Sequence, residues 1–100
     1  MYIVRNIFRL QFGKAREAIA VMKENLALME RGGVSGARLL VDTVGDFYTL
    51  VLEIPAESLD DIGPERMQER ITNREEWQRQ YARFTPLVLE GRREIFRVVE

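Results

Sequence analysis

The stretch from Leu39 to Ile54, LLVDTVGDFYTLVLEI, constrains the fold most, because it reads as a strand hairpin with apolar residues on both faces. Gly45 and Asp46 predict a two-residue turn of type II′, and pairing outward from it places Leu40 opposite Val51. One face then holds Leu39, Val41, Tyr48, Leu50, Leu52 and Ile54. The other face holds Leu40, Val44, Phe47 and Val51 among polar residues. A single layer of helices buries one face of a sheet, so the second apolar face needs a different cover.

The rest of the chain alternates between the two-residue period of strands and the 3.6-residue period of helices. The pattern predicts a strand over Tyr2 to Phe12 and a helix from Lys14 to about Arg31, which Gly32 and Gly33 end. A second helix is predicted through REEWQRQYARF, and a last strand through RREIFRVVE after Gly91. This order predicts an α+β, ferredoxin-like βαββαβ fold over residues 1–100, as a single domain. Its four-stranded antiparallel sheet carries both helices on one face.

Composition excludes several classes of function. Fifteen basic and sixteen acidic side chains give a net charge of -1, so no charge excess attracts nucleic acid or an anionic membrane. The chain has no cysteine and no histidine, which removes thiolate sites and the commonest metal and haem ligand. We therefore expect no metal site and no cofactor. The opening MYIVRNIFRL is neither a signal-peptide core nor a membrane span, and we expect a cytoplasmic protein.

RNA-recognition domains share this strand order, and they stack bases on aromatic residues of the two central strands. Here the uncovered face offers only Phe47, and DFYTLVLEI lacks the basic residue and glycine that open the RNA-binding motif. The sequence therefore argues against a nucleic-acid partner.

An apolar sheet face without helices usually marks an interface. A second copy of the sheet, stacked face to face, would cover Leu40, Val44, Phe47 and Val51, so we expect a homodimer. Arginine side chains share this face with carboxylates, at Arg5, Arg9, Arg38, Asp42 and Glu53. An ion-pair network that fixes the register of the dimer explains them better than an anion site inside a barrel.

Three stretches carry a family resemblance: YIVRNIFRLQFGKAREA, TVGDFYTLVLE and WQRQYARFTPLVLEGRREIFRVV. On these the chain resembles the dimeric α+β barrel superfamily, and within it is similar to NIPSNAP-like domains. The resemblance implies a homodimer whose two sheets form a barrel, with a cavity in each subunit between sheet and helices. Members of the superfamily include cofactor-free monooxygenases, haem-handling proteins, muconolactone isomerase-like enzymes and proteins with no settled activity.

The candidate site consists of Asn6, Tyr48, Trp77 and Tyr81. Alternation places Asn6 and Tyr48 on the helix-covered side of the sheet, and Trp77 and Tyr81 on a helix that faces them. These side chains either line a pocket with convergent polar groups or fill an ordinary core with hydrogen-bonded tips. The first interpretation predicts a protein that binds a small apolar or aromatic molecule.

Two alternatives stay open at this point. The chain could form a structural or interaction homodimer without catalytic activity. It could also be a cofactor-free monooxygenase or isomerase-like enzyme, in which proton transfer would fall to Tyr48, Tyr81 or a buried carboxylate, assisted by Asn6.

Overall fold

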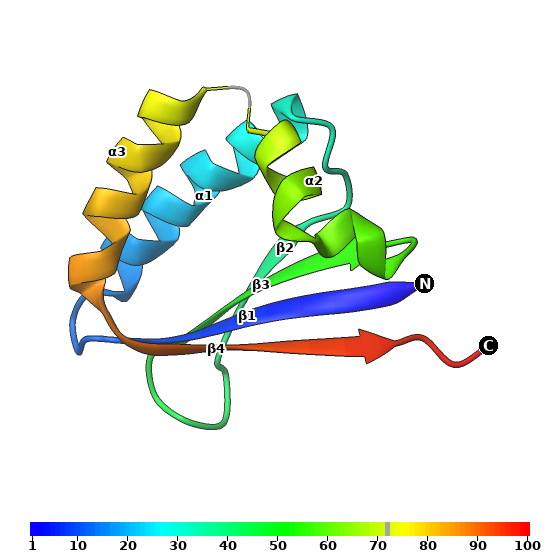
Figure 1. Cartoon of the computed structure of the whole chain (residues 1–100). Helices are drawn as coiled ribbons and strands as arrows, with labels where there is room; N and C mark the ends of the chain where they lie inside the picture. Colours follow the sequence, from blue (N-terminus) through cyan, green and yellow to red (C-terminus); the bar gives the residue numbers. More distant parts are fainter. Residues whose placement is uncertain (72) are drawn as a thin grey trace.

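The computed structural model describes residues 1–71 and 73–100, and in this part of the chain four strands form one antiparallel sheet. They are β1 (Tyr2–Leu10), β2 (Arg38–Val41), β3 (Thr49–Ala56) and β4 (Val88–Arg97), in the order β2-β3-β1-β4. The helices α1 (Ala15–Arg31) and α3 (Arg74–Phe84) lie together over one face of the sheet (Figure 1). This arrangement confirms the predicted ferredoxin-like fold, with its helices on one side.

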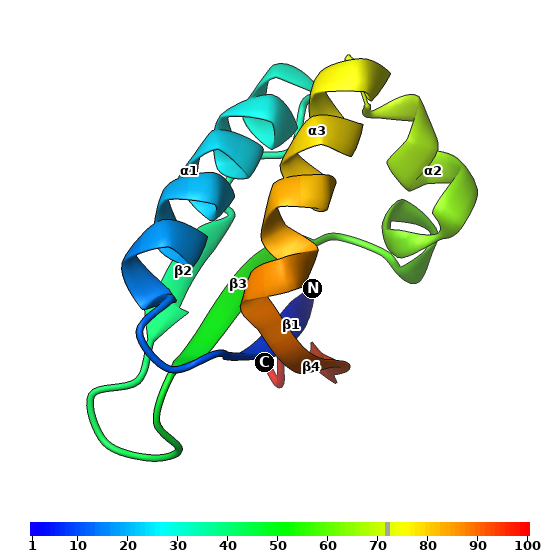
Figure 2. The same cartoon turned by 90° about the vertical axis from the view of Figure 1, so that its left-hand side faces the viewer.

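Shorter helical segments connect these elements. A 3₁₀ turn, η1 (Leu59–Ile62), and the helix α2 (Pro64–Glu69) lie between β3 and α3, and a second 3₁₀ turn, η2 (Thr85–Leu87), joins α3 to β4. Pro64 occupies the start of α2, as its fixed φ favours. Figure 2 shows α1 and α3 side by side, with α2 beside this pair.

Asn73 is the N-cap residue of α3. Its side-chain oxygen accepts a hydrogen bond from the backbone N–H of Glu76 at 3.0 Å, which satisfies one of the free donors of the first turn.

The core lies between the sheet and the two long helices. Alternate residues of β1 and β3 point toward the helices, and Leu50 of β3 is fully buried against α1, where Ala18 is equally buried. Each large apolar side chain buried in this way stabilises the fold by about 1.5–3 kcal/mol. The buried core residues are Val4, Leu10, Ala18, Val21, Met22, Val34, Leu50, Leu52, Ile54, Phe84 and Leu87.

The register of the hairpin is as predicted, with Leu40 opposite Val51. The predicted two-residue turn is wrong, because β2 ends at Val41 and residues 42–48 form a loop that projects from the end of the sheet (Figure 1). The carboxylate of Asp42 explains the early end, since its Oδ1 accepts the backbone N–H of Thr49 at 2.8 Å. Tyr48 adopts a left-handed backbone with φ of 59°, which extended strands do not contain.

The bounds of the first and last strands also differ from the prediction, and β4 ends at Arg97. The strand β1 ends at Leu10, so Phe12 lies outside it, and β4 begins at Val88 and includes Gly91. Gly91 is paired with Phe8, and a Cβ at Gly91 would lie 3.1 Å from the Phe8 ring. The ring therefore occupies the space where a side chain would stand, which explains a glycine inside a strand.

Gly32 lies where the end of α1 meets the end of α2. A Cβ at Gly32 would collide with the backbone carbonyl of Arg70. We expect Gly32→Ala to lower the free energy of unfolding by about 1–3 kcal/mol, because the backbone must move to admit a methyl group. Gly63→Ala is the control, since the nearest atom to its Cβ would be 3.5 Å away. Urea denaturation that gives both variants the same stability would contradict this packing.

Candidate functional site

A groove of about 570 Å³ lies between the sheet and the helices. Residues of β1, β3 and β4 form its floor, and residues of α1, α2 and α3 form its walls and roof. Its lining is mainly apolar, with the methionines Met22, Met29 and Met67 and the aromatic residues Phe8, Trp77 and Phe84. The volume falls in the range that small-molecule sites occupy.

Asn6 and Arg93 form a polar pair on the groove floor. They are direct partners in the pairing of β1 with β4, so their side chains share the helix-covered side of the sheet. Arg93 Nε donates a hydrogen bond to Asn6 Oδ1 at 2.7 Å. Asn6 therefore lies where the sequence placed it, next to an arginine that the sequence did not single out.

A second polar pair joins the two long helices above the groove. Asn25 of α1 donates through Nδ2 to Gln80 Oε1 of α3 at 3.2 Å, and Gln80 is only 4% exposed. Among the described residues, no buried side-chain nitrogen or oxygen lacks a hydrogen-bond partner. The fully buried polar atoms of this region are thus satisfied, and the polar residues line a groove without filling it.

Trp77 and Tyr81 form an aromatic wall on α3. Their rings stack at a centroid distance of 5.5 Å and an interplanar angle of 10°, one helical turn apart. Tyr81 is 58% exposed, so it stands at the mouth of the groove while Trp77 lies farther in.

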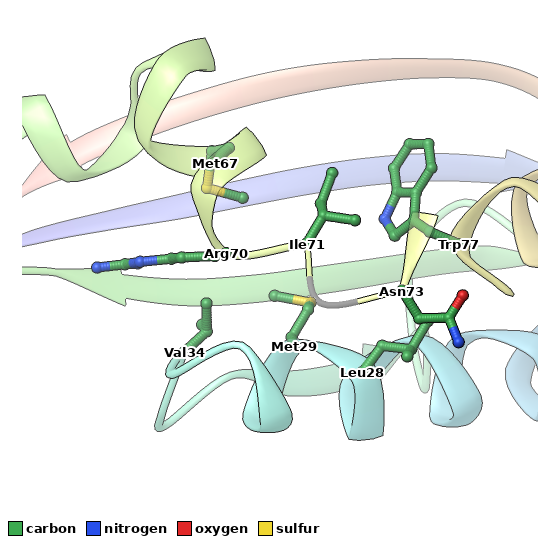
Figure 3. A pocket seen from close by; sticks show the side chains of 8 residues that line it. All are labelled: Leu28, Met29, Val34, Met67, Arg70, Ile71, Asn73 and Trp77. Carbon is green, nitrogen blue, oxygen red and sulfur yellow. The ribbon is translucent and has the colours of Figure 1, made fainter. Parts of the chain in front are cut away.

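A smaller pocket of about 100 Å³ adjoins the groove at Trp77. The two cavities share Met29, Met67 and Trp77. Figure 3 shows the indole of Trp77 at one end of the small pocket, with Met29 and Met67 on opposite sides of it. Flexible methionine side chains therefore form the boundary between the two cavities.

Tyr48 does not join the other three predicted site residues. It packs edge-on against Phe12 at a centroid distance of 4.9 Å, and it lines a shallow pocket near the start of α1. Alternation predicted the side of the sheet, but Tyr48 lies four residues from Leu52, the partner of Asn6. That spacing is about 13 Å along a strand, too far for the two side chains to meet.

The face of the sheet opposite the helices carries a central ion-pair cluster. Glu53 is 6% exposed, and it accepts hydrogen bonds from Arg5 Nε and Arg38 Nε, each at 2.9 Å. The Arg5 guanidinium also lies 5.3 Å from the centre of the Phe96 ring. Two other charged residues were predicted on this face. Arg9 does not take part in the Glu53 cluster, and Asp42 accepts a hydrogen bond from Thr49 in the hairpin loop.

The pKa of Glu53 reflects two opposed effects. Burial raises the pKa, because desolvation penalises the charged carboxylate. Hydrogen bonds from Arg38 and Arg5, together with their positive charges, outweigh burial and hold the pKa of Glu53 below its ordinary value. Glu53 is therefore ionised at neutral pH.

Two residues predicted to lie on the face opposite the helices do not lie on a strand. Val44 and Phe47 belong to the loop 42–48, and Phe47 lines a shallow pocket with Ala15 and Ile19 of α1. The longer loop explains the difference, because pairing stops before it reaches them. Leu40 and Val51 do lie on this face, beside the apolar residues Ile3, Ile7 and Phe96.

Residues 1–71 and 73–100 contain no group of three or more acidic side chains placed to hold a metal ion. Among these same residues, no helix combines the length and the apolar character needed to cross a bilayer.

The sequence itself matches no protein-family model and no curated protein. Solved structures nevertheless share its architecture. A NIPSNAP family protein from Agrobacterium tumefaciens superposes with a TM-score of 0.81 at 19% identity, over 99% of this chain and 93% of that chain. An uncharacterized NIPSNAP domain protein from Burkholderia xenovorans gives a TM-score of 0.80 at 16% identity, over 99% and 95%. The chain shares the fold of these NIPSNAP proteins.

The same architecture extends to an enzyme. An antibiotic biosynthesis monooxygenase superposes on this chain with a TM-score of 0.74 at 11% identity, over 100% of both chains. The α+β ferredoxin-like fold of the single chain, which the sequence resemblance implied, is therefore confirmed. Because one fold hosts many activities, function has to be argued from the groove.

Proposed function

We propose that the protein binds a small apolar or aromatic molecule in the groove between sheet and helices. The observation that carries the proposal is the groove itself, about 570 Å³ in volume and lined mainly by apolar side chains. Its stacked Trp77 and Tyr81 suit the flat face of an aromatic ring, and its methionines adapt to irregular shapes.

Burial of apolar surface can supply enough free energy for such a ligand to bind. Burying roughly 200 Å² of apolar ligand surface provides about 5 kcal/mol before the entropy losses of binding are subtracted. The polar pairs Asn6–Arg93 and Asn25–Gln80 then offer directional contacts that select among apolar compounds.

A groove-filling variant tests this proposal. We expect 2-naphthamide, a neutral aromatic probe, to raise the melting temperature of the wild-type protein, because a ligand that binds only the native state stabilises it. Met22→Leu keeps the volume of the groove and should retain this shift. Met22→Trp puts a larger side chain into the groove and should lose the shift, in a variant whose circular dichroism spectrum matches that of the wild type.

The test measures melting temperatures with and without 2-naphthamide at matched protein concentration. The result that contradicts the proposal is a wild-type protein that does not respond, or a Met22→Trp variant that responds as fully as Met22→Leu.

We also propose that a second copy of this chain covers the uncovered face, which consists of Ile3, Arg5, Ile7, Arg38, Leu40, Val51, Glu53, Arg92, Glu94 and Phe96. Phe96 is 47% exposed there and Leu40 is 36% exposed, which supports an interface. The charges of this face alternate in sign, with Arg92 paired to Glu94 at 3.1 Å. A face that carries both signs can be complementary to itself across a two-fold axis.

The proposed interface and the groove lie on opposite sides of the sheet. Ligand binding and dimer formation can therefore be tested with separate variants.

A further inference from the structure

We propose that the ligand of the groove carries a negatively charged oxygen group, and that Arg93 binds this group. The inference rests on the proposed function of the groove. Its ligand would be an aromatic acid, with the ring along Trp77 and Tyr81 and the carboxylate, or an equivalently placed anionic oxygen, at Arg93.

The charge of the groove favours an anion. Its lining includes Arg93, whose side chain lies on the helix-covered side of the sheet, and no aspartate or glutamate. A positive charge at the edge of an apolar groove attracts a negatively charged ligand, although Arg93 is an exposed residue and its charge is screened by solvent.

Arg93 has N–H donors beyond the one that bonds to Asn6. A guanidinium carries five N–H donors, and the Nε–H of Arg93 is the one that bonds to Asn6, at 2.7 Å. Arg93 takes part in none of the ion pairs formed among residues 1–71 and 73–100. Arg92, its neighbour in sequence, instead pairs with Glu94 at 3.1 Å. The terminal nitrogens of Arg93 are therefore available for a carboxylate, which the planar guanidinium can bind through two hydrogen bonds.

Asn6 is a positioning residue in this arrangement. Arginine only donates hydrogen bonds, so the amide of Asn6 must turn its oxygen to Arg93 and its NH₂ group away from it. The bond to Nε fixes the orientation of the guanidinium plane at the groove floor. A polar residue among the core side chains of β1 thus has a specific role, which is to hold the arginine that selects the ligand.

A matched pair of probes tests the inference. 2-Naphthoate and 2-naphthamide have the same ring system and differ in charge, and their affinities are measured by isothermal titration calorimetry at neutral pH. We expect the wild-type protein to bind 2-naphthoate more tightly than 2-naphthamide. Arg93→Gln should weaken 2-naphthoate binding about tenfold, the usual scale for losing a charge-assisted contact, and leave 2-naphthamide within about twofold.

Two further variants separate charge, geometry and position. Arg93→Lys keeps the charge without the planar fork and should retain part of the preference for 2-naphthoate. Arg16→Gln removes an exposed arginine of α1 that does not line the groove, and it should bind both probes as the wild type does. Asn6→Leu keeps the charge of Arg93 but removes the hydrogen bond that orients its guanidinium. The ratio of 2-naphthoate affinity to 2-naphthamide affinity should therefore fall toward the ratio measured for Arg93→Gln.

Different results would contradict the role of Arg93 and the groove proposal. Equal affinities of the wild-type protein for the two probes, or 2-naphthoate affinity unchanged in a folded Arg93→Gln variant, would overturn the role of Arg93 and leave the groove proposal standing. If neither probe binds the wild-type protein up to its solubility limit, the groove proposal and the role of Arg93 are both wrong.

Discussion

Leu40→Asp is expected to convert the protein from a dimer to a monomer at micromolar concentration, whereas Val41→Asp should leave the dimer intact. The two residues are adjacent in β2 but point to opposite sides of the sheet. Leu40 lies on the uncovered face, where a second copy would bury the new carboxylate without a partner. Burying an unpaired charge costs several kcal/mol, which corresponds to a loss of affinity of roughly a thousandfold or more. Val41 is 55% exposed on the helix side, so the same charge there stays in water.

Static light scattering measures this difference directly. The wild type and Val41→Asp should each give about twice the 11.7 kDa mass of the chain, and Leu40→Asp should give the monomer mass. A wild-type protein that scatters as a monomer, or a Leu40→Asp variant that stays dimeric, would refute the proposed interface.

Glu53→Gln is expected to lower the free energy of unfolding at neutral pH by about 1–3 kcal/mol, the usual cost of removing one partner from a buried charged hydrogen bond. The carboxylate accepts from both Arg5 and Arg38, so the uncharged amide loses two charge-assisted bonds. The side chains of Arg5 and Arg38 are 44% and 66% exposed, and solvent screening of these charges keeps the loss below that of a fully buried pair.

The effect of Glu53→Gln should depend on pH with a definite sign. The folded-state pKa of Glu53 lies below its ordinary value of 4.5, so protons bind the unfolded chain first as the pH falls. The stability that the ionised carboxylate contributes is therefore present above that value, and it is lost as the pH falls through the folded-state pKa. The wild type should lose this contribution in acid, and the stability difference from Glu53→Gln should shrink.

Urea denaturation from neutral to acidic pH, at fixed protein concentration, tests this prediction. Glu24→Gln is the matched control, because Glu24 pairs with Arg83 at 2.7 Å but both side chains are about half exposed. Exposed pairs contribute about 0–1 kcal/mol, so this variant should differ little from the wild type at any pH. Stability curves for Glu53→Gln and the wild type that run parallel across this pH range would contradict the role of Glu53.

The fold was predictable because its main elements follow the periodicity of apolar residues. The register of β2 with β3 followed from counting outward from Gly45, even though the turn itself was predicted wrongly. The turn could not be foreseen because it depends on one side-chain bond, from Thr49 N to Asp42 Oδ1, and on the left-handed backbone of Tyr48. Such local bonds compete with strand pairing without changing the apolar pattern.

The candidate site was predictable only in part. Alternation gives the side of the sheet on which Asn6 lies, but not which residue of another strand stands beside it. That neighbour, Arg93, depends on where β4 begins and on a shift of register between Arg9 and Leu10. Neither feature leaves a signal in the apolar pattern, because β4 is an edge strand with most of its side chains exposed.

The methionine methyl groups test the central claim, that the groove is a binding site, most directly. The chain has four methionines, of which Met22, Met29 and Met67 line the groove and Met1 does not. We predict that titrating 2-naphthamide into protein labelled with ¹³C at the methionine methyls will shift the signals of these three residues along one saturable curve. The signal of Met1 should stay in place as an internal control. Three groove methionines that do not shift, or that shift no more than Met1 at saturating probe, would contradict the proposal.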